Sequence, residues 1–443
     1  MSDEHPENGD ERPSTDPERH GSGGDGRAPV LEADENGQAE IEEARERERE
    51  TATVDLGASV GQRFRAAVTG AGLVITLLSI VSALVIGAMI IALSDDATRE
   101  SLGYFTARPS DTFANGWAII SGAYSAMFRG AFAGTGPLSE TLVAATPLIL
   151  TGLAVAVPLR TGLFNIGGEG QMVVGGTVAG FLGFAFVGLP MIIHLPLALL
   201  AGAVAGGLYG WIPGILKART GAHEVISTIM LNNIALLTLA WVLTTELFRR
   251  PDRLDPISRP VQDSALLPQF TPTLRVNVGL IVALLLAVAI FWMMERSTTG
   301  FELNAVGLNP HAARTAGMNP GRSIVTAMST GGLLAGAAGA AVVLGVQGRI
   351  TDGFSAGLGF EGITVALLGR GGVGGTVAAG LLFGSMRSGG RLMQAETGIA
   401  LDLVLVLQGL IIVFIAAPGL VRAIFRIRAA GAGSGQITKG WGS

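Results

Sequence analysis

The sequence predicts an all-α polytopic membrane protein with about ten transmembrane helices. Three observations support this fold class: the mean hydropathy is +0.50, only 15% of the 443 residues are charged, and 65 are Gly. A soluble domain carries about 25% charged residues. From residue 70 onward the chain is a series of apolar stretches, each near the roughly 20 residues that a helix needs to cross a bilayer. A soluble enzyme is therefore disfavoured.

The first 60 residues differ from the rest of the chain. They hold 18 Asp and Glu against 6 Arg and almost no large apolar side chains, so they bury too little surface to offset the entropy of ordering. We expect residues 1–60 to be a disordered, acidic, cytoplasmic tail that is either simply solvated or has a regulatory or partner-binding role. No signal peptide is expected. A transmembrane domain is predicted over 61–428, followed by a short flexible tail over 429–443.

Ten apolar stretches account for the body of the chain, although the eighth is too short to cross a bilayer alone. An even number places both termini on one side. Lys and Arg differ little between the two faces, so the positive-inside signal is weak, but basic residues at both ends of the body favour cytoplasmic termini. The stretches are Gly70–Leu93, Leu138–Val157, Glu169–Gly188, Leu195–Leu216, Glu224–Thr244, Val276–Met294, Pro320–Gly345, Gly357–Gly369, Val373–Gly390 and Ile399–Leu420.

The high glycine content predicts close helix packing. In lipid the hydrophobic effect does not drive helices together, so small residues at the interface let their backbones approach. We expect this role for the ladders Gly202-Gly206-Gly210, Gly176-Gly180 and Gly380-Gly384, in preference to a nucleotide site.

Several kinds of chemistry are excluded or disfavoured by the composition. The chain has no Cys, so disulfides and Cys-ligated metals are excluded. Its only lysines, Lys217 and Lys439, do not follow Gly, so there is no P-loop. The five His are scattered without metal-ligand spacing, and no metal, cofactor or nucleic acid is expected. The classes of membrane protein that remain are a pore, a secondary transporter and the membrane half of a pump whose motor is a separate protein.

The segment Gly300–Arg322 lies between two apolar stretches and bears on that choice. Asn309 suits a helix N-cap, Pro310 suits the first helical position, and Gly317 suits a left-handed position after the helix end. They predict a helix of about two turns over His311–Ala316, with Asn319 capping the next long helix. Such a helix suits a groove on a partner protein, although a helical corner without a partner is an alternative.

This segment resembles the coupling loop of binding-protein-dependent ABC permeases of the simple-sugar and nucleoside branch, most closely the nucleoside uptake permeases. The resemblance runs in the family's order over residues 138–420. The motifs that carry it are A-V-G-L-N-P-H-A-A-R-T-A-G-M-N (305–319), G-L-F-N-I-G-G-E-G-Q-M (162–172), H-E-V-I-S-T-I-M-L-N-N-I-A (223–235), G-F-E-G-I-T-V-A-L-L-G (359–369) and L-Q-G-L-I-I (407–412).

The resemblance implies partners and an orientation. The expected partners are a cytoplasmic ATP-binding subunit, a second permease (a paralogue or a second copy), a lipid-anchored or extracellular solute-binding protein, and the membrane lipid. The coupling helix would be cytoplasmic. Its residues would be Asn309, His311, Ala312, Ala313, Arg314 and Gly317.

Ionisable residues inside apolar stretches indicate function by default. Glu169 and Glu361 each begin an apolar stretch just after glycines, which is typical of broken helices whose free N–H groups hold polar ligand atoms. The two stretches run in opposite directions on the predicted topology. Similar glycine-rich segments at Gly206–Gly210 and Gly380–Gly384 further support an inverted repeat of five plus five helices.

The candidate substrate-path residues surround these breaks. Amides and carboxylates suit ribose hydroxyls and base edges, and aromatic rings suit stacking, but each side chain has a structural alternative as a helix cap, an interhelical hydrogen bond or core packing. For Glu169 the alternative is a cap on its own helix. The candidates are Phe164, Asn165, Glu169, Gln171, Phe360, Glu361 and Gln408.

These features predict an ABC importer permease in the plasma membrane that carries a nucleoside or simple sugar and is not itself an enzyme. The alternative is an ion-coupled secondary transporter, in which Glu169, Glu361 or Asp402 would bind the ion, but such a transporter has no need of a capped loop helix. A purely structural subunit is disfavoured by the buried carboxylates. The loop Leu247–Arg275 is long enough to meet an external binding protein, or is only solvated.

Overall fold

The computed structural model describes residues 71–252 and 255–425. They belong to the larger of two compact units, which spans Gly70–Ser443. The segments predicted as tails, 1–60 and 429–443, lie outside the described residues.

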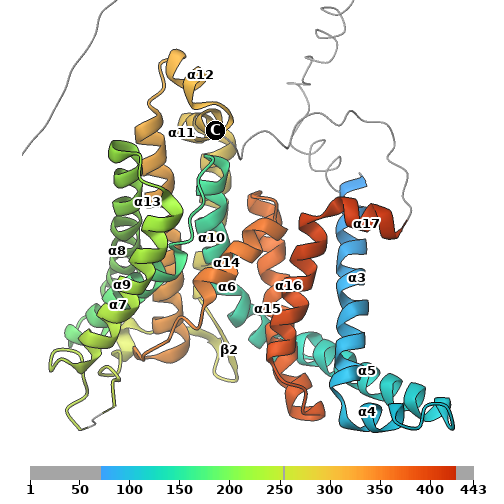
Figure 1. Ribbon diagram of the computed structural model, residues 1–443. Helices are drawn as coiled ribbons and strands as arrows, with labels where there is room; N and C mark the ends of the chain where they lie inside the picture. The colour runs from blue at the N-terminus through green and yellow to red at the C-terminus, as the bar shows by residue number, and fades with distance from the viewer. Residues whose placement is uncertain (1–70, 253–254, 426–443) are drawn as a thin grey trace, which may run out of the picture. The chain divides into compact units, whose positions relative to one another are not determined.

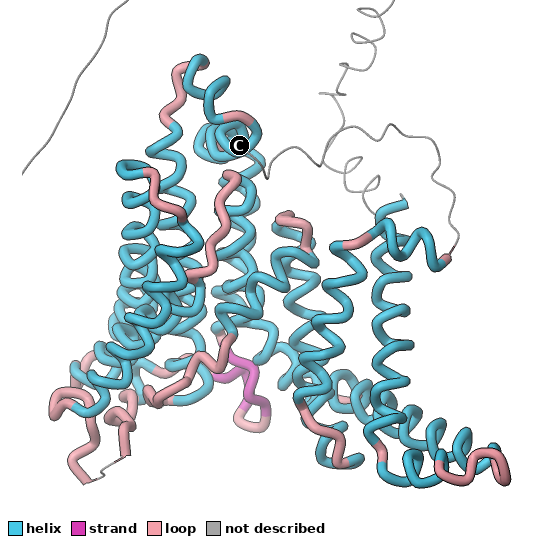
Figure 2. Tube along the Cα trace, viewed as in Figure 1, coloured by secondary structure: helices cyan, strands magenta, loops and turns pink. Residues whose placement is uncertain are grey.

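The described chain is a succession of helices with one short antiparallel hairpin, β1–β2 (Figures 1 and 2). The elements are α3 (Ala71–Ser94), α4 (Asp96–Leu102), α5 (Pro109–Phe132), α6 (Thr135–Arg160), α7 (Gly168–Ala185), α8 (Met191–Thr220), α9 (Glu224–Thr244), η1 (Asp263–Ala265), β1 (Gln269–Thr271), β2 (Leu274–Asn277), α10 (Gly279–Arg296), α11 (Thr298–Leu308), α12 (Pro310–Thr315), α13 (Pro320–Val342), η2 (Val343–Gln347), α14 (Leu358–Leu368), α15 (Val373–Thr397), α16 (Asp402–Ala416) and α17 (Pro418–Ile424).

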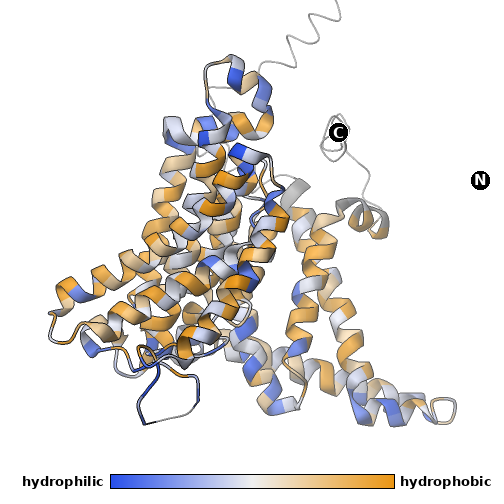
Figure 3. Ribbon diagram, turned by 60° about the vertical axis from the view of Figure 1, so that its left-hand side comes forward, coloured by the Kyte–Doolittle hydropathy of each residue, from blue (hydrophilic) through white to orange (hydrophobic). Residues whose placement is uncertain are grey.

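Every predicted apolar stretch overlaps a helix, and the all-α class is confirmed. Within the described residues, six helices are long and apolar enough to cross a membrane, namely those at Thr76–Ser94, Thr135–Arg160, Met191–Thr220, Glu224–Thr244, Gly279–Arg296 and Pro320–Gln347. The helices α14 and α16 are apolar but shorter, with 11 and 15 residues. Figure 3 shows hydrophobic residues along the helices. The chain is therefore a multi-pass membrane protein.

Helices α6 and α13 form the centre of the bundle. Their most apolar segments are 89% and 72% buried, whereas the other four candidate spans are 22–28% buried. Helix α13 packs against α8 and α7, and α6 packs in the same way against α15 and α14. The two central helices also contact each other. Each of them packs against one short helix that begins inside the bundle (α7 or α14) and one glycine-rich helix (α8 or α15).

Glycine makes these central contacts possible, as the sequence predicted. A Cβ atom on Gly206 of α8 would lie 2.5 Å from the carbonyl oxygen of Gly332 on α13. On α15, a Cβ at Gly384 would lie 2.7 Å from the backbone nitrogen of Ala145 on α6. Any larger side chain would push the helices apart, so the predicted packing role of the ladders is confirmed.

The two ends of the bundle differ. The α12 end carries α11 and α12 and the start of α13, and the hairpin end carries η1, β1 and β2 (Figure 1). At the hairpin end the segment after α9 folds back onto η2, which continues α13. Val261 N–H donates to the carbonyl of Gly348 and Leu267 N–H donates to that of Leu344, both at 2.9 Å. This segment is therefore held against the helices.

Candidate functional site

Two helices begin inside the bundle, and their first turns meet. Helix α7 starts at Gly168 and runs toward the hairpin end, whereas α14 starts at Leu358 and runs toward the α12 end. A Cβ atom on Gly168 would lie 3.2 Å from the Gly359 carbonyl oxygen, and one on Gly359 would lie 2.6 Å from the Gly168 carbonyl carbon. Only glycine allows the two backbones to come this close. We call this contact the α7–α14 junction.

The side chain of Glu169 joins the two helices at this junction. It is 3% exposed, and its carboxylate accepts a 2.8 Å hydrogen bond from the backbone N–H of Gly359 and another from the Ser355 hydroxyl. A helix N-terminus carries a partial positive charge, so two of them facing each other would repel without a negative group between them. Glu169 supplies that group, and the helix that it caps is α14 rather than its own.

Asn165 and Gln171 shape the turn that precedes α7. Their side-chain amides form a reciprocal pair, with N···O distances of 3.0 and 3.1 Å. The Asn165 side-chain oxygen also accepts from Gly167 N–H at 3.0 Å, and its amide donates to the Ala154 carbonyl of α6. Both side chains are buried. In this conformation they hold the break in α7 to the central helix.

Asn232 of α9 completes this arrangement and was not among the predicted site residues. Its side-chain oxygen accepts from Gly170 N–H and its amide donates to the Ile166 carbonyl, both at 2.9 Å. It therefore satisfies one free N–H of α7 from a neighbouring helix. The only sequence signal is an Asn pair inside an apolar stretch.

Glu361 lies in the first turn of α14 and pairs with Arg387 of α15 at 3.3 Å. Phe360, beside it, is 44% exposed. Arg387 was not predicted as a site residue, although an arginine inside a predicted span is a signal of the same kind as a carboxylate. Arg387 places a charged pair beside the α7–α14 junction.

The remaining predicted substrate residues are spread more widely. Phe164 is half-buried just before Asn165, and Gln408 is buried on α16. Helix α16 packs against α3, α14 and α15, so Gln408 lies on a helix next to α14. The structure thus brings Asn165, Glu169 and Gln171 together.

The predicted loop helix is present as α12, bounded by the expected caps. The Asn309 side-chain oxygen accepts from the N–H groups of His311 and Ala312, both at 3.0 Å. Gly317 has the left-handed φ of 86° that glycine favours, and Asn319 caps α13 through Arg322 N–H. The buried residue of α12 is Ala313, whereas His311, Ala312 and Arg314 are exposed.

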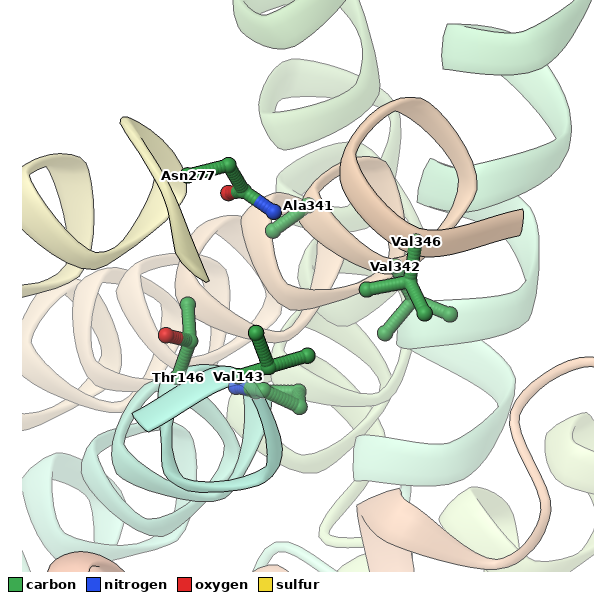
Figure 4. A pocket seen from close by; sticks show the side chains of 7 residues that line it. Val143, Thr146, Asn277, Ala341, Val342 and Val346 are labelled. Carbon is green, nitrogen blue, oxygen red and sulfur yellow. The ribbon is translucent and has the colours of Figure 1, made fainter. Parts of the chain in front are cut away.

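A small pocket lies apart from the junction, between α6, β2 and the end of α13 (Figure 4). Asn277 closes one side of it, donating to the Gly345 carbonyl at 2.9 Å. Its volume of about 10 Å³ is space for one water molecule, so this pocket is not a solute site. In residues 71–252 and 255–425, no group of three or more His, Asp or Glu is placed to hold a metal ion.

Comparison with known proteins gives a family match. Residues 138–416 match the family model described as branched-chain amino acid transport system / permease component. The guanosine ABC transporter permease protein NupP of Bacillus subtilis is 45% identical over 312 residues, covering 70% of this chain and 89% of the relative. The glucose ABC transporter permease protein TsgB13 of Haloferax volcanii is 36% identical over 305 residues, or 66% and 79% of the two chains.

A third relative is the nucleoside ABC transporter permease protein NupB of Lactococcus lactis. It is 35% identical over 302 residues, which cover 66% of this chain and 82% of the relative. No solved structure matches the chain.

Proposed function

We propose that this chain, which belongs to the family of branched-chain amino acid transport system permease components, is the subunit through which an ABC importer carries a nucleoside across the plasma membrane. It is a transport subunit and not an enzyme. An ATP-binding subunit and a solute-binding protein are its partners. A nucleoside is favoured over a sugar because a guanosine permease is 45% identical and a glucose permease 36% identical.

The observation that supports the route is the α7–α14 junction. Polar side chains gather where two helices begin inside an apolar bundle, and broken helices of this kind hold solutes in membrane transporters. Glu169 and Asn165 offer hydrogen bonds to ribose hydroxyls and base edges, and Phe164 and Phe360 offer faces for stacking. Because Glu169, Asn165 and Gln171 are engaged with protein groups here, solute contact requires some of these hydrogen bonds to exchange.

The proposed topology is ten transmembrane helices in an inverted repeat of five plus five. Its support is that the long helix of each half packs against helices of the other half: α6 packs against α14 and α15, and α13 packs against α7 and α8. Both termini are proposed to be cytoplasmic. The start of α3 and helix α17 lie toward the end of the bundle that carries α12 (Figure 1), which supports this orientation.

Helix α12 is proposed to dock on the ATP-binding subunit. Its exposed His311, Ala312 and Arg314 would meet the partner, while the buried Ala313 anchors the helix. A second permease, either a paralogue or another copy of this chain, would complete the membrane part.

Uptake of labelled solutes tests the substrate. Cells that express the full importer would be given radiolabelled guanosine and radiolabelled glucose in turn, with cells lacking only this chain as the control. We expect guanosine uptake that depends on this chain. Chain-dependent glucose uptake without guanosine uptake would overturn the nucleoside proposal and leave the family assignment intact.

A further inference from the structure

One face of α15 carries two arginines that are one helical turn apart, and each is paired with a carboxylate from another helix. Arg387 pairs with Glu361 of α14 at 3.3 Å, and Arg391 pairs with Glu140 of α6 at 3.1 Å. We call these two pairs the α15 charge row. They lead from beside the α7–α14 junction toward the hairpin end.

The inner pair of this row lies far from either end of its helix. Arg387 is 14 positions after the start of α15 and 10 before its end, which is about 20 Å and about 15 Å along a helix. Its side chain is nevertheless 27% exposed, and that of Arg391 is 49% exposed. The charges are therefore only partly covered by this chain.

Helix α10 shows what a lipid-exposed face of this protein looks like. Its central residue Val288 is 65% exposed, and the other exposed side chains from Ile281 to Trp292 are also apolar, whereas the charged Glu295 and Arg296 lie in its last turn. A charged side chain in the middle of a bilayer carries a large free-energy cost. Charges at such depth therefore face protein or water. The exposed side chains of the α15 charge row are charged, whereas exposed side chains in the middle of α10 include Val, Leu and Trp.

A hollow lies along the outer part of the row. It is lined by Glu140, Ser388, Arg391 and Leu392, among others, which come from the end of α5, the start of α6 and the last part of α15. Glu140 also pairs with Arg275 of β2 at 3.1 Å. The hollow thus has a charged and polar strip, formed by Glu140, Ser388 and Arg391, in an otherwise apolar lining, and Arg275 adds a second arginine beside Glu140.

We propose that this face of α15 lines a water-filled access route from the hairpin end to the α7–α14 junction. The route would take a neutral solute rich in hydroxyl and carbonyl groups. The paired charges supply donors and acceptors to such groups, while the surplus arginine disfavours cations. This inference rests on the proposed function and orientation, and it adds Arg387 and Arg391 to the residues that the solute passes.

Cysteine accessibility tests the route, and the chain suits the method because it has no native Cys. Arg387→Cys probes the middle of the row, and Leu392→Cys probes the hollow while leaving both ion pairs intact. Val288→Cys is the matched lipid-facing control at the middle of α10, and Thr273→Cys, in the exposed turn between β1 and β2, is the positive control. A membrane-impermeant methanethiosulfonate thiol reagent that carries a sulfonate group is added outside cells that express the full importer.

We expect labelling at 392, at 387 and at 273 but not at 288, with labelling at 387 slowed severalfold by saturating guanosine. The access route would be overturned if position 273 is labelled, neither 387 nor 392 is labelled, and the Leu392→Cys variant still takes up guanosine. That result would leave the proposed function intact. Labelling at 288 equal to that at 387 would also overturn it. Absence of labelling at 273 would contradict the orientation on which the inference rests.

Discussion

The backbone N–H of Gly359 donates a 2.8 Å hydrogen bond to the carboxylate of Glu169, which lies 190 residues earlier in the chain. This bond links the first turns of α7 and α14, two helices that run in opposite directions from one point. Any movement of one helix away from the other must break it. We therefore expect both the stability of the junction and its proposed role in transport to depend on this carboxylate.

Replacing Glu169 with Gln should lower both stability and uptake. The amide keeps an acceptor for Gly359 but removes the negative charge between two helix N-termini, and a hydrogen bond to a charged group contributes about 1.5–3 kcal/mol. We expect a lower Tm in detergent and a decrease in guanosine uptake, while the importer still assembles. The matched control is Glu396→Gln, since Glu396 pairs with Arg129 at the surface. Uptake as high as in the control would sink the site hypothesis.

Replacing Gly359 with Ala should separate the two helices. The new methyl group would meet the backbone of Gly168 and Glu169, and overpacking of this kind costs about 1–3 kcal/mol. Gly374→Ala is the control, because a Cβ there meets nothing within 4 Å and Ala in a helix is favoured over Gly by up to about 1 kcal/mol. Thermal unfolding should show a lower Tm for the first variant only. Equal Tm values would mean that the close contact is not rigid.

Replacing Asn309 with Ala should weaken coupling to the ATP-binding subunit more than it weakens the fold. Two backbone N–H groups of α12 lose their acceptor, and loss of an N-cap costs about 1 kcal/mol, which is large for a helix of six residues. We expect reduced stimulation of ATP hydrolysis by the solute-loaded binding protein. Asn319→Ala, which uncaps α13 through a single N–H, should instead lower mainly Tm. The docking role of α12 would be contradicted if Asn309→Ala mainly lowered Tm and Asn319→Ala mainly reduced the stimulation of ATP hydrolysis.

Replacing Arg314 with Cys tests the orientation of the chain. Position 314 lies on the exposed side of α12, so an impermeant thiol reagent should label it in permeabilised cells and not in intact ones. Thr273→Cys, at the opposite end of the bundle, should be labelled in intact and in permeabilised cells alike. Labelling of position 314 from outside intact cells would place α12 on the wrong side for an ATP-binding partner.

Features set by neighbouring residues were predictable from the sequence. The caps at Asn309 and Asn319 and the left-handed Gly317 depend on a few consecutive residues, and the structure confirms all three. The long helices were predictable because spanning a bilayer demands length and apolarity in one continuous segment. The family comparison supports the importer and not the ion-coupled transporter that the sequence left as an alternative.

The partners of buried polar groups were not predictable in the same way. From the sequence, the structural alternative for Glu169 was that it caps its own helix. The carboxylate instead caps α14, because the fold brings residues 169 and 359 together. Arg387 and Asn232 were missed for the same reason, since each meets its partner only after helices far apart in sequence have packed. Glycine ladders showed that helices pack closely but not which helices.

The source of energy for uptake tests the central claim most directly. Proteoliposomes would contain this chain, its second permease and the ATP-binding subunit, with ATP supplied on the side of α12 and the loaded solute-binding protein on the other. We expect guanosine to cross only when ATP and the ATP-binding subunit are both present, with no effect of collapsing proton or sodium gradients. Gradient-driven guanosine uptake by this chain without the ATP-binding subunit would contradict the account.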